Sequence, residues 1–587
     1  MRTYIYHNLP RLAQLQALTR YTSCLTPTVL TRNRKTQYCL LEPVVAQRRL
    51  LFLSTAAANV SQDHIVRCPL PDLDIPTNVP FHQFIFDKCD AFKDNVAVED
   101  FLTGKQYTYA QLKEKSIKVA SGLHKLGYGK GDVLLLSSPN NVDVTVLMLA
   151  CAANGMWFSS ANPNFIAREL AIQLNHSGAV VLVAASALTA TAKEALTNTE
   201  FPNRVKDLFV FGEAPGFQPF QKLLDDDGSS FPDVEINPLE DVYLLPYSSG
   251  TTGLPKGVML THRNCLANCM QVITSIPVSP DDRCLGLLPL YHIFGMVVVQ
   301  FSVLLGGARI SYLPKFDPEI FLKCIQDRKI TFAHLVPPLV VFLAKHPLVS
   351  NYDLTSLKQI VCGAAPLGID ISNEFLKRFS HGIKLNQGYG LTETGPVLNF
   401  DFTNTLGSVG PVVPNTEGKI VDVETKRTLG PEERGEYCVR GPQVMKGYFK
   451  NQKATDEMIE PDGWLHTGDI GYYNKDGICY IEERLKELIK YKGSQVAPAE
   501  LEALLLGHPS IQDAAVIGVP DEAAGELPKA FIVKKPGSNV SEAEIIQFIE
   551  GRVTHTKRLR GGVQFIDEVP KNPSGKILRR VLRAKYL

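Results

Sequence analysis

From about residue 80 onward, short aliphatic and β-branched runs alternate with longer amphipathic stretches. The short runs are apolar at nearly every position, as expected for strands that are buried on both faces of a parallel sheet. They predict strands over residues 133–136, 180–183, 208–211 and 360–362, and the 3.6-residue periodicity of residues 108–126 predicts a helix. The alternation of the two patterns favours layered α/β architecture with largely parallel sheets.

The pattern changes near residue 484. It predicts a helix over residues 498–506, strands over 514–519 and 530–533, a helix over 542–553 and a strand over 563–565. About a hundred residues of mixed α+β pattern predict a small C-terminal domain. A chain of 587 residues is long enough for such a domain beside a much larger body.

The longest apolar stretch, residues 293–308, is shorter than the roughly 20 residues that cross a bilayer, and Gln300 and Ser302 interrupt it. It predicts a buried helix, and the sequence predicts no transmembrane span.

Charge is distributed unevenly. Residues 1–62 carry eight Lys or Arg and one acid, so the remainder of the chain has a net charge of −6 within a total of +1. A mildly acidic body argues against nucleic-acid binding. Residues 1–60 are rich in Arg, Ser and Thr, which predicts a transit peptide for the mitochondrial matrix. A disordered leader, and a peroxisomal or cytoplasmic location, are the alternatives; a secretory signal fits the sequence less well.

The twelve cysteines are scattered singly, which indicates a reducing compartment and predicts no structural zinc site. Cys265 and Cys269 are one helical turn apart, but no neighbouring cluster completes a metal site, so we expect two buried thiols.

Residues 247–257, Y-S-S-G-T-T-G-L-P-K-G, follow an apolar run and carry the most informative chemistry. Glycines allow backbone amides to approach an anion, hydroxyls add donors and a lysine adds positive charge. The segment therefore predicts a polyphosphate-binding loop. It is not a Walker loop, because Pro255 precedes Lys256 and Gly257 follows it.

This loop resembles the signature of the adenylate-forming acyl-CoA synthetase superfamily. Six further segments resemble that family's motifs in the same order, and together they cover the chain from about residue 80 to its end: 288–295 (L-P-L-Y-H-I-F-G), 363–367 (G-A-A-P-L), 386–395 (N-Q-G-Y-G-L-T-E-T-G), 464–471 (W-L-H-T-G-D-I-G), 484–493 (R-L-K-E-L-I-K-Y-K-G) and 573–576 (P-S-G-K). The branch of 4-coumarate:CoA ligases and beetle luciferases is the most similar.

The resemblance implies a large N-terminal adenylation domain of layered β-sheets and helices at residues 61–482. It also implies a hinge at 483–486 and a mobile α+β lid at 487–587. The implied activity is AMP-forming carboxylic acid:CoA ligation, with ATP, Mg²⁺ and coenzyme A. The implied acid is a medium-chain fatty acid or an aryl-propenoic acid. A luciferase-type oxygenase and a non-catalytic acyl or nucleotide binder are the alternatives, and the sequence does not indicate the oligomeric state.

By the same resemblance, the ATP and AMP site comprises Ser248, Ser249, Gly250, Thr251, Thr252, Gly253, Lys256, Gln387, Gly388, Tyr389, Thr392, Asp469, Arg484 and Lys486. Glu393 is the implied Mg²⁺ ligand, and His292, Phe294 and Gly363 are the implied acyl pocket. Without the surrounding motifs, His292 would be interpreted as a core histidine and Arg484 as part of a solvated helix face.

Lys576, on a loop with a neighbouring glycine, is the main catalytic candidate. It is suited to neutralising both the attacking carboxylate and the α-phosphate. His292, Lys490 and Gln495 are further catalytic candidates, and Lys492 and Gly493 are implied to approach coenzyme A. The family commonly has Asp where this chain has Glu483, and we expect the longer carboxylate to be tolerated at the hinge.

Overall fold

The computed structural model describes residues 59–248, 255–492, 494–571 and 575–587. The chain divides into two units, Met1–Thr55 and Ala56–Leu587, and the first lies outside the described residues. The transit-peptide hypothesis therefore stays a prediction. No helix within the described ranges is both long and apolar enough to cross a membrane.

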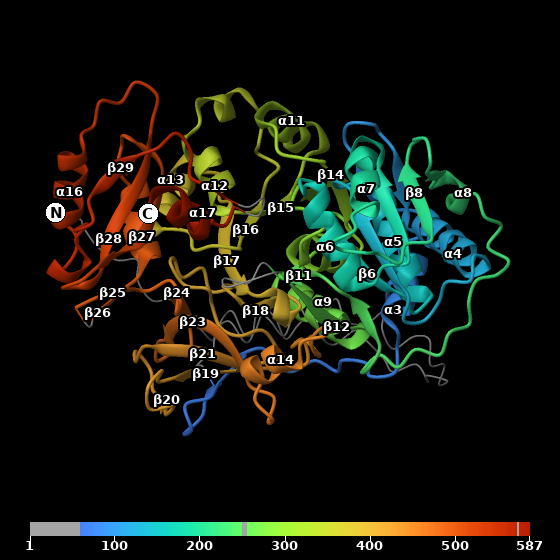
Figure 1. Cartoon of the computed structure of the whole chain (residues 1–587), viewed down its shortest axis with the longest axis horizontal. Coiled ribbons are helices and arrows are strands. Elements are labelled where there is room, and N and C mark those ends of the chain that lie inside the picture. Colours follow the sequence, from blue (N-terminus) through green and yellow to red (C-terminus); the bar gives the residue numbers. More distant parts are fainter. Residues whose placement is uncertain (1–58, 249–254, 493, 572–574) are drawn as a thin grey trace, which may run out of the picture. The chain divides into compact units, whose positions relative to one another are not determined.

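The first large sheet of the second unit is mainly parallel in its centre, as the sequence predicts (Figure 1). Its order is β11 (Tyr247–Ser248), β12 (Lys256–Thr261), β10 (Val242–Leu244), β6 (Trp157–Ala161), β5 (Val133–Ser137), β7 (Val181–Ala185), β8 (Asp207–Phe211) and β9 (Gln218–Pro219), with β22 (Gly447–Tyr448) paired to β12. The strands predicted at 133–136, 180–183 and 208–211 are confirmed as β5, β7 and β8.

The second large sheet is parallel from β3 to β17 and antiparallel at its two edges. Its order is β18 (Val397–Phe400), β17 (Lys384–Gly390), β16 (Gln359–Cys362), β15 (Phe332–Leu335), β13 (Arg283–Gly286), β14 (Arg309–Tyr312), β3 (Val96–Asp100) and β4 (Gln106–Thr108). The strand predicted at 360–362 is β16.

Helices cover both faces of these sheets because alternate residues of a strand point to opposite faces. Leu134 and Leu136 of β5 join the central apolar cluster, whereas Val133 and Leu135 join a second cluster on the other face. The central cluster includes residues of α3 (Phe81–Ala91), α4 (Tyr109–Lys125), α5 (Val142–Ala153) and α9 (His262–Ser275). The outer faces are covered by α6 (Ala167–Ser177) and α7 (Thr189–Leu196) on one sheet, and by α11 (Pro318–Arg328), α12 (Pro337–Lys345) and α13 (Ile369–Arg378) on the other.

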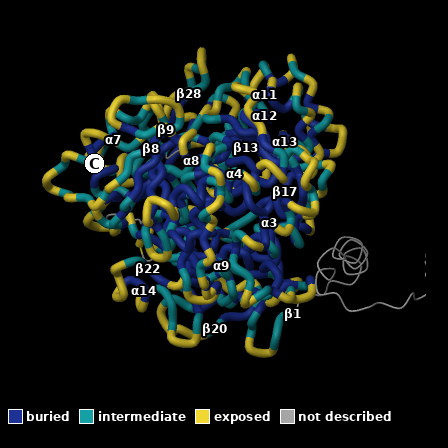
Figure 2. The backbone as a smooth tube through the Cα atoms, turned by 90° about the vertical axis from the view of Figure 1, so that its right-hand side faces the viewer, coloured by how far each residue is buried: buried dark blue, intermediate teal, exposed yellow. Residues whose placement is uncertain are grey.

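The prediction of α/β layers is thereby confirmed, and α4 corresponds to the helix predicted at 108–126. Eleven of the twelve residues of α5 are buried, and only Asp143 in its first turn is partly exposed, as expected for a mostly apolar helix inside a large protein. Figure 2 shows the buried backbone concentrated in the interior, with exposed segments mostly at turns. The remaining short elements of the body are η1 (Ser186–Leu188), α8 (Gln221–Leu224), η3 (Pro347–Asn351), η4 (Thr392–Thr394) and α14 (Gln452–Met458).

A third sheet is antiparallel, and the sequence interpretation missed it. It comprises β1 (Asn59–Val60), β2 (Val66–Arg67), β19 (Glu417–Val421), β21 (Gly435–Arg440), β23 (Leu465–Tyr473) and β24 (Cys479–Arg484), with β20 (Thr428–Leu429) beside β19. Its strands expose one face in part and interleave polar residues, so they lack the continuous apolar runs of the parallel strands. This sheet carries Asp469 and Arg484.

The smaller C-terminal domain has its own sheet and apolar core. The strands are β25 (Ile489–Tyr491), β26 (Ser494–Val496), β27 (Ile511–Asp521), β28 (Gly525–Lys534) and β29 (Val563–Phe565), and the helices are α15 (Pro498–Leu506), α16 (Glu542–Glu550) and α17 (Arg579–Tyr586), with η5 (His555–Lys557) between α16 and β29. The predicted helix 498–506 and strand 563–565 match α15 and β29 at both ends.

The apolar stretch 293–308 is helical, as predicted, but most of it is a π-helix, η2 (Phe294–Ser302), followed by α10 (Val303–Leu305). π-Helical turns are rare and are frequent at functional sites. At its start, a Cβ atom on Gly295 would lie 2.1 Å from the carbonyl oxygen of Pro289. The turn that presents His292 therefore requires glycine at this position.

We expect Gly295→Ala to lower the free energy of unfolding by about 2–4 kcal/mol, because backbone atoms would have to move to admit the methyl group. Urea denaturation followed by fluorescence measures the change. Gly129→Ala is the matched control, since a Cβ there meets no atom within 4 Å. An equal effect of the two substitutions would contradict the requirement for close backbone approach.

Candidate active site

The predicted phosphate loop is flanked by two strands that pair with each other. Ser248 of β11 lies opposite Lys256 of β12 in an antiparallel register. The intervening candidates Ser249, Gly250, Thr251, Thr252 and Gly253 lie outside the described residues. The two flanking candidates are thus brought together.

Glu393 lies close to the Lys256 side of this loop. It belongs to η4, which packs against β11 and β12 and begins at Thr392. Its Oε1 accepts a hydrogen bond from the hydroxyl of Tyr448 at 2.8 Å, and the Lys256 ammonium lies 4.6 Å from the centre of the Tyr448 ring. Tyr448 therefore links the candidate metal ligand to the candidate phosphate ligand, a role that the sequence interpretation missed.

Glu393 is almost fully buried, and a single carboxylate is a suitable protein ligand for an Mg²⁺ ion that takes its other ligands from phosphates and water. The donor type at this position therefore fits magnesium.

A cavity of about 890 Å³ joins several of the predicted nucleotide residues. Gln387, Gly388, Tyr389, Asp469, Arg484 and Lys576 line it. The first three lie on β17, Asp469 and Arg484 lie on the antiparallel sheet, and Lys576 comes from the C-terminal domain. The sequence thus predicted a set of residues, from segments far apart in the chain, that the fold brings to one cavity.

Asp469 is positioned by strand pairing and by a tyrosine. Its Cα lies opposite that of Arg484 across β23 and β24, and the Arg484 Nε atom is 3.6 Å from Asp469 Oδ1. The hydroxyl of Tyr389 donates to Oδ2 at 2.5 Å. Burial raises the pKa of Asp469, while Arg484, Tyr389 and Lys576 oppose that rise.

Lys576 lies in a site that disfavours its charge. Burial, followed by the nearby positive charge of Arg484, lowers the pKa of its ammonium group to about 8. The same ammonium helps to lower the pKa of His292 to about 4, after the larger effect of burial. Lys576 and His292 therefore share one electrostatic environment, and a polyanion bound there would relieve the excess of positive charge.

The candidate acyl-pocket residues contact one another. A Cβ on Gly363 would lie 3.0 Å from Cε1 of Phe294 and 3.4 Å from the carbonyl oxygen of Gly388, so a side chain there would displace the Phe294 ring. The Phe294 amide donates to Nδ1 of His292 at 3.2 Å, which leaves the proton of the neutral imidazole on Nε2. His334, whose ring meets Phe294 edge to face at 5.9 Å, extends this wall and was not predicted.

One residue of the cavity wall is conformationally strained. Ala364 has φ +71°, a region that is costly for residues with a Cβ and that occurs preferentially at functional sites. The preceding residue is Gly363, and the amide of Leu367 donates to the side-chain oxygen of Gln387 at 2.9 Å. The segment 363–367 is therefore fixed against β17 at the cavity edge.

Three further candidates do not line this cavity. Lys486, Lys490 and Lys492 are exposed and do not line it. Lys490 pairs with Gln495 between β25 and β26. Gly493 lies outside the described residues, and their roles stay predictions.

Glu483, the departure from the family pattern, is buried at the junction between the third sheet and the C-terminal domain. Its carboxylate accepts from the amides of Arg484 at 2.9 Å and Ala499 at 2.8 Å. Ala499 lies in the first turn of α15, where an unpaired amide and the helix dipole favour a negative charge. The longer side chain is thus accommodated.

Comparison with known proteins identifies the family to which these residues belong. Residues 85–449 match the family described as AMP-binding enzyme, and residues 500–576 match its C-terminal domain. The chain belongs to the AMP-binding enzyme family. This AMP-binding enzyme is 42% identical over 536 residues to 4-coumarate–CoA ligase 1 of Solanum tuberosum, a match that covers 89% of this chain and 97% of the relative.

Two solved structures share the fold. ATP-bound MatB from Rhodopseudomonas palustris is 28% identical, with a TM-score of 0.77 over 86% of this chain and 99% of that one. A fatty acyl CoA synthetase from Mycobacterium tuberculosis is 27% identical, with a TM-score of 0.68 over 86% and 98% of the two chains. The large N-terminal and small C-terminal domains are those of this family.

Proposed function

We propose that this enzyme is an AMP-forming carboxylic acid:CoA ligase acting on an aryl-propenoic acid. The acid and ATP form an acyl-adenylate and pyrophosphate, and the thiol of coenzyme A then takes the acyl group and releases AMP. The observation that carries the proposal is the convergence of Lys576, Asp469 and Arg484 on one cavity, with His292 in the same electrostatic environment.

Adenylation requires an acid oxygen to attack the α-phosphorus while pyrophosphate departs, so the site has to bring several anions together and neutralise them. Lys576 supplies a cation to the attacking carboxylate and the α-phosphate. Asp469 accepts from the ribose hydroxyls, and Arg484 beside it donates to ribose or phosphate oxygens. Neutral His292 orients the carbonyl of the acid or adenylate by donating from Nε2.

Lys256 and Ser248, at the two ends of the loop, hold the β- and γ-phosphates. Glu393 would hold Mg²⁺, which when bound offsets the negative charge of the triphosphate.

Thiol transfer uses another face of the C-terminal domain. Lys490 and Lys492 are exposed in the present arrangement, in which Lys576 lies at the cavity. Rotation about residues 483–486 would withdraw Lys576 and bring Lys490, Lys492 and their neighbours towards the adenylate. One site would then serve two reactions in turn.

Two observations support an aromatic acid. The relative named above is a 4-coumarate–CoA ligase with 42% identity, and the wall beside His292 is built from Phe294 and His334. A medium-chain fatty acid is the second candidate, supported by the likeness to a fatty acyl CoA synthetase.

The reaction is tested by measuring pyrophosphate release from ATP with a panel of carboxylic acids, with and without coenzyme A. We expect cinnamate-like acids to release pyrophosphate and, once coenzyme A is present, to give acyl-CoA and AMP. A preference for medium-chain fatty acids would change the proposed substrate class but not the proposed reaction. Folded protein that releases pyrophosphate with no acid of either class would disprove the proposal.

The role of Lys576 is tested by separating the two half-reactions. We expect Lys576→Ala to slow adenylation by roughly 10²–10³-fold, because a charge aimed at the transition state is lost, and to slow transfer from synthetic acyl-adenylate by less than about tenfold. Lys585→Ala, on the exposed side of α17, is the control and should leave both rates near normal. Equal losses in the two half-reactions would exclude this role.

The pH dependence of adenylation should follow the ionisation of Lys576. Because the pKa of Lys576 is lowered to about 8, the ammonium form disappears above that pH, and kcat/KM for adenylation should fall there. The arginine of Lys576→Arg stays positively charged above pH 8. The variant should therefore react more slowly but show no fall of kcat/KM in that pH range. A decline of the same shape in both proteins would assign it to another group.

A further inference from the structure

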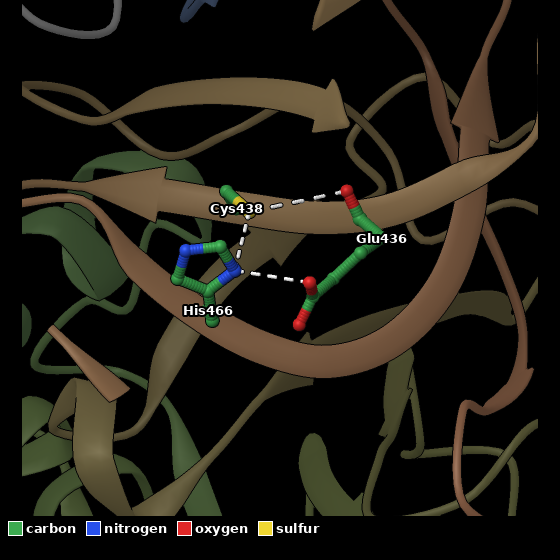
Figure 3. Close-up of side chains that lie close together, drawn as sticks. All are labelled: Glu436, Cys438 and His466. Atoms are coloured by element: carbon green, nitrogen blue, oxygen red, sulfur yellow. Dashed lines mark hydrogen bonds and ion pairs between the residues drawn. The ribbon is translucent and has the colours of Figure 1, made fainter. Parts of the chain in front are cut away.

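Outside the proposed active site, three side chains with metal-binding atoms converge on one face of the antiparallel sheet. Glu436 and Cys438 are two residues apart on β21, so they point to the same face. His466 lies on the neighbouring strand β23, and its Cα is the cross-strand partner of Cys438. Figure 3 shows the thiol, imidazole and carboxylate directed toward one another.

Their spacing is close to that of ligands around one ion. The Cys438 Sγ atom is 3.4 Å from His466 Nδ1, which is 3.0 Å from Glu436 Oε2, and one ligand atom from each residue lies within 4.8 Å of the others. Tetrahedral zinc with bonds of about 2.0–2.3 Å separates its ligands by about 3.3–3.8 Å. Shifts of up to about 1 Å would bring the three ligand atoms to these separations.

In two of the three residues, the polar side-chain atom that would not bind the ion already has a hydrogen-bond partner. His466 Nε2 lies 2.7 Å from Oε1 of Glu460, so an imidazole that binds metal through Nδ1 would donate its remaining proton to a carboxylate. The other oxygen of Glu436 accepts from the amide of Gly468 at 3.2 Å. Such outer partners orient ligands and strengthen binding in metalloproteins.

The cluster is buried except on the side of His466, where an ion could enter from solvent. Cys438 is fully buried and Glu436 nearly so, whereas 22% of the His466 side chain is exposed. A thiolate, an imidazole and a carboxylate form a mixed donor set that suits zinc, and three protein ligands leave one position for water. The thiolate and carboxylate would neutralise a divalent ion, with the protons of the thiol and Nδ1 released to solvent.

We propose that Glu436, Cys438 and His466 form a zinc-binding site, with Glu460 as the outer partner of His466. This revises the expectation that the chain has no structural zinc. Cys438 and His466 are 28 residues apart and neither belongs to a paired cysteine motif, so only the strand pairing brings them together.

Cobalt(II) titration of the full chain after removal of metals by chelation tests the site without relying on activity. We expect one equivalent of Co²⁺ to bind and to give a near-ultraviolet thiolate charge-transfer band, and Zn²⁺ to displace it and raise the melting temperature by several degrees. Cys438→Ser should abolish the band. Cys479→Ser, which removes a buried thiol of the same sheet with no histidine partner in contact among the described residues, should retain it.

His466→Gln provides a second variant if Cys438→Ser does not fold, and it should weaken cobalt binding at least tenfold. Folded native protein without a thiolate band at excess Co²⁺ would overturn the proposal, and the three groups would then form a hydrogen-bonded structural cluster only. A band of equal intensity in Cys438→Ser would also overturn it.

Discussion

Arg579 is a guanidinium buried among three carboxylates, and the position of Lys576 depends on it. Its nitrogens lie 2.7 Å from Glu487, 2.8 Å from Glu502 and 3.7 Å from Glu483, and its Nε donates to the carbonyl of Val516. Removal of one partner from a buried ion pair typically costs about 3–5 kcal/mol, because the remaining charges stay desolvated. Arg579 therefore fixes the start of α17, three residues after Lys576, against Glu483 of the proposed hinge and against α15.

The charges of this cluster link Glu483, in the proposed hinge, to the position of Lys576 at the cavity. Burial raises the pKa of Glu502 to about 7 and raises that of Glu483, so the carboxylates are stabilised mainly by Arg579. A rotation of the C-terminal domain that carried Arg579 and Glu502 away from Glu483 would have to re-solvate that carboxylate. The amide of Ala499 and the guanidinium thus favour the arrangement in which Lys576 faces Asp469. In the proposed rotation, ligand exchange at the cavity would have to supply the free energy for leaving this arrangement.

The pattern of apolar and polar residues predicted the helices and strands correctly where short-range sequence determines the secondary structure. The uniformly apolar β5 and β7, the amphipathic α4 and the well-bounded α15 were all predicted from sequence. The antiparallel sheet was not, because its strands mix polar and apolar residues.

Within the candidate site, the sequence predicted Asp469, Arg484 and Lys576 through motifs. It missed Tyr448, His334 and Arg579, which act through contacts with residues far away in the chain. The strain at Ala364 could not be predicted either, since alanine carries no preference for φ +71°.

Strand β23 shows how one element serves two sites. Asp469 lines the cavity, whereas His466 faces the cluster with Cys438 and Glu436. The Gly468 amide between them donates to Glu436, so the carboxylate that would bind zinc also holds the backbone beside the residue that would bind ribose. Any ion that fixes Glu436 thereby fixes the peptide preceding Asp469. Because coupling free energies are reciprocal, nucleotide binding at Asp469 would alter zinc affinity by the same factor by which zinc alters nucleotide affinity.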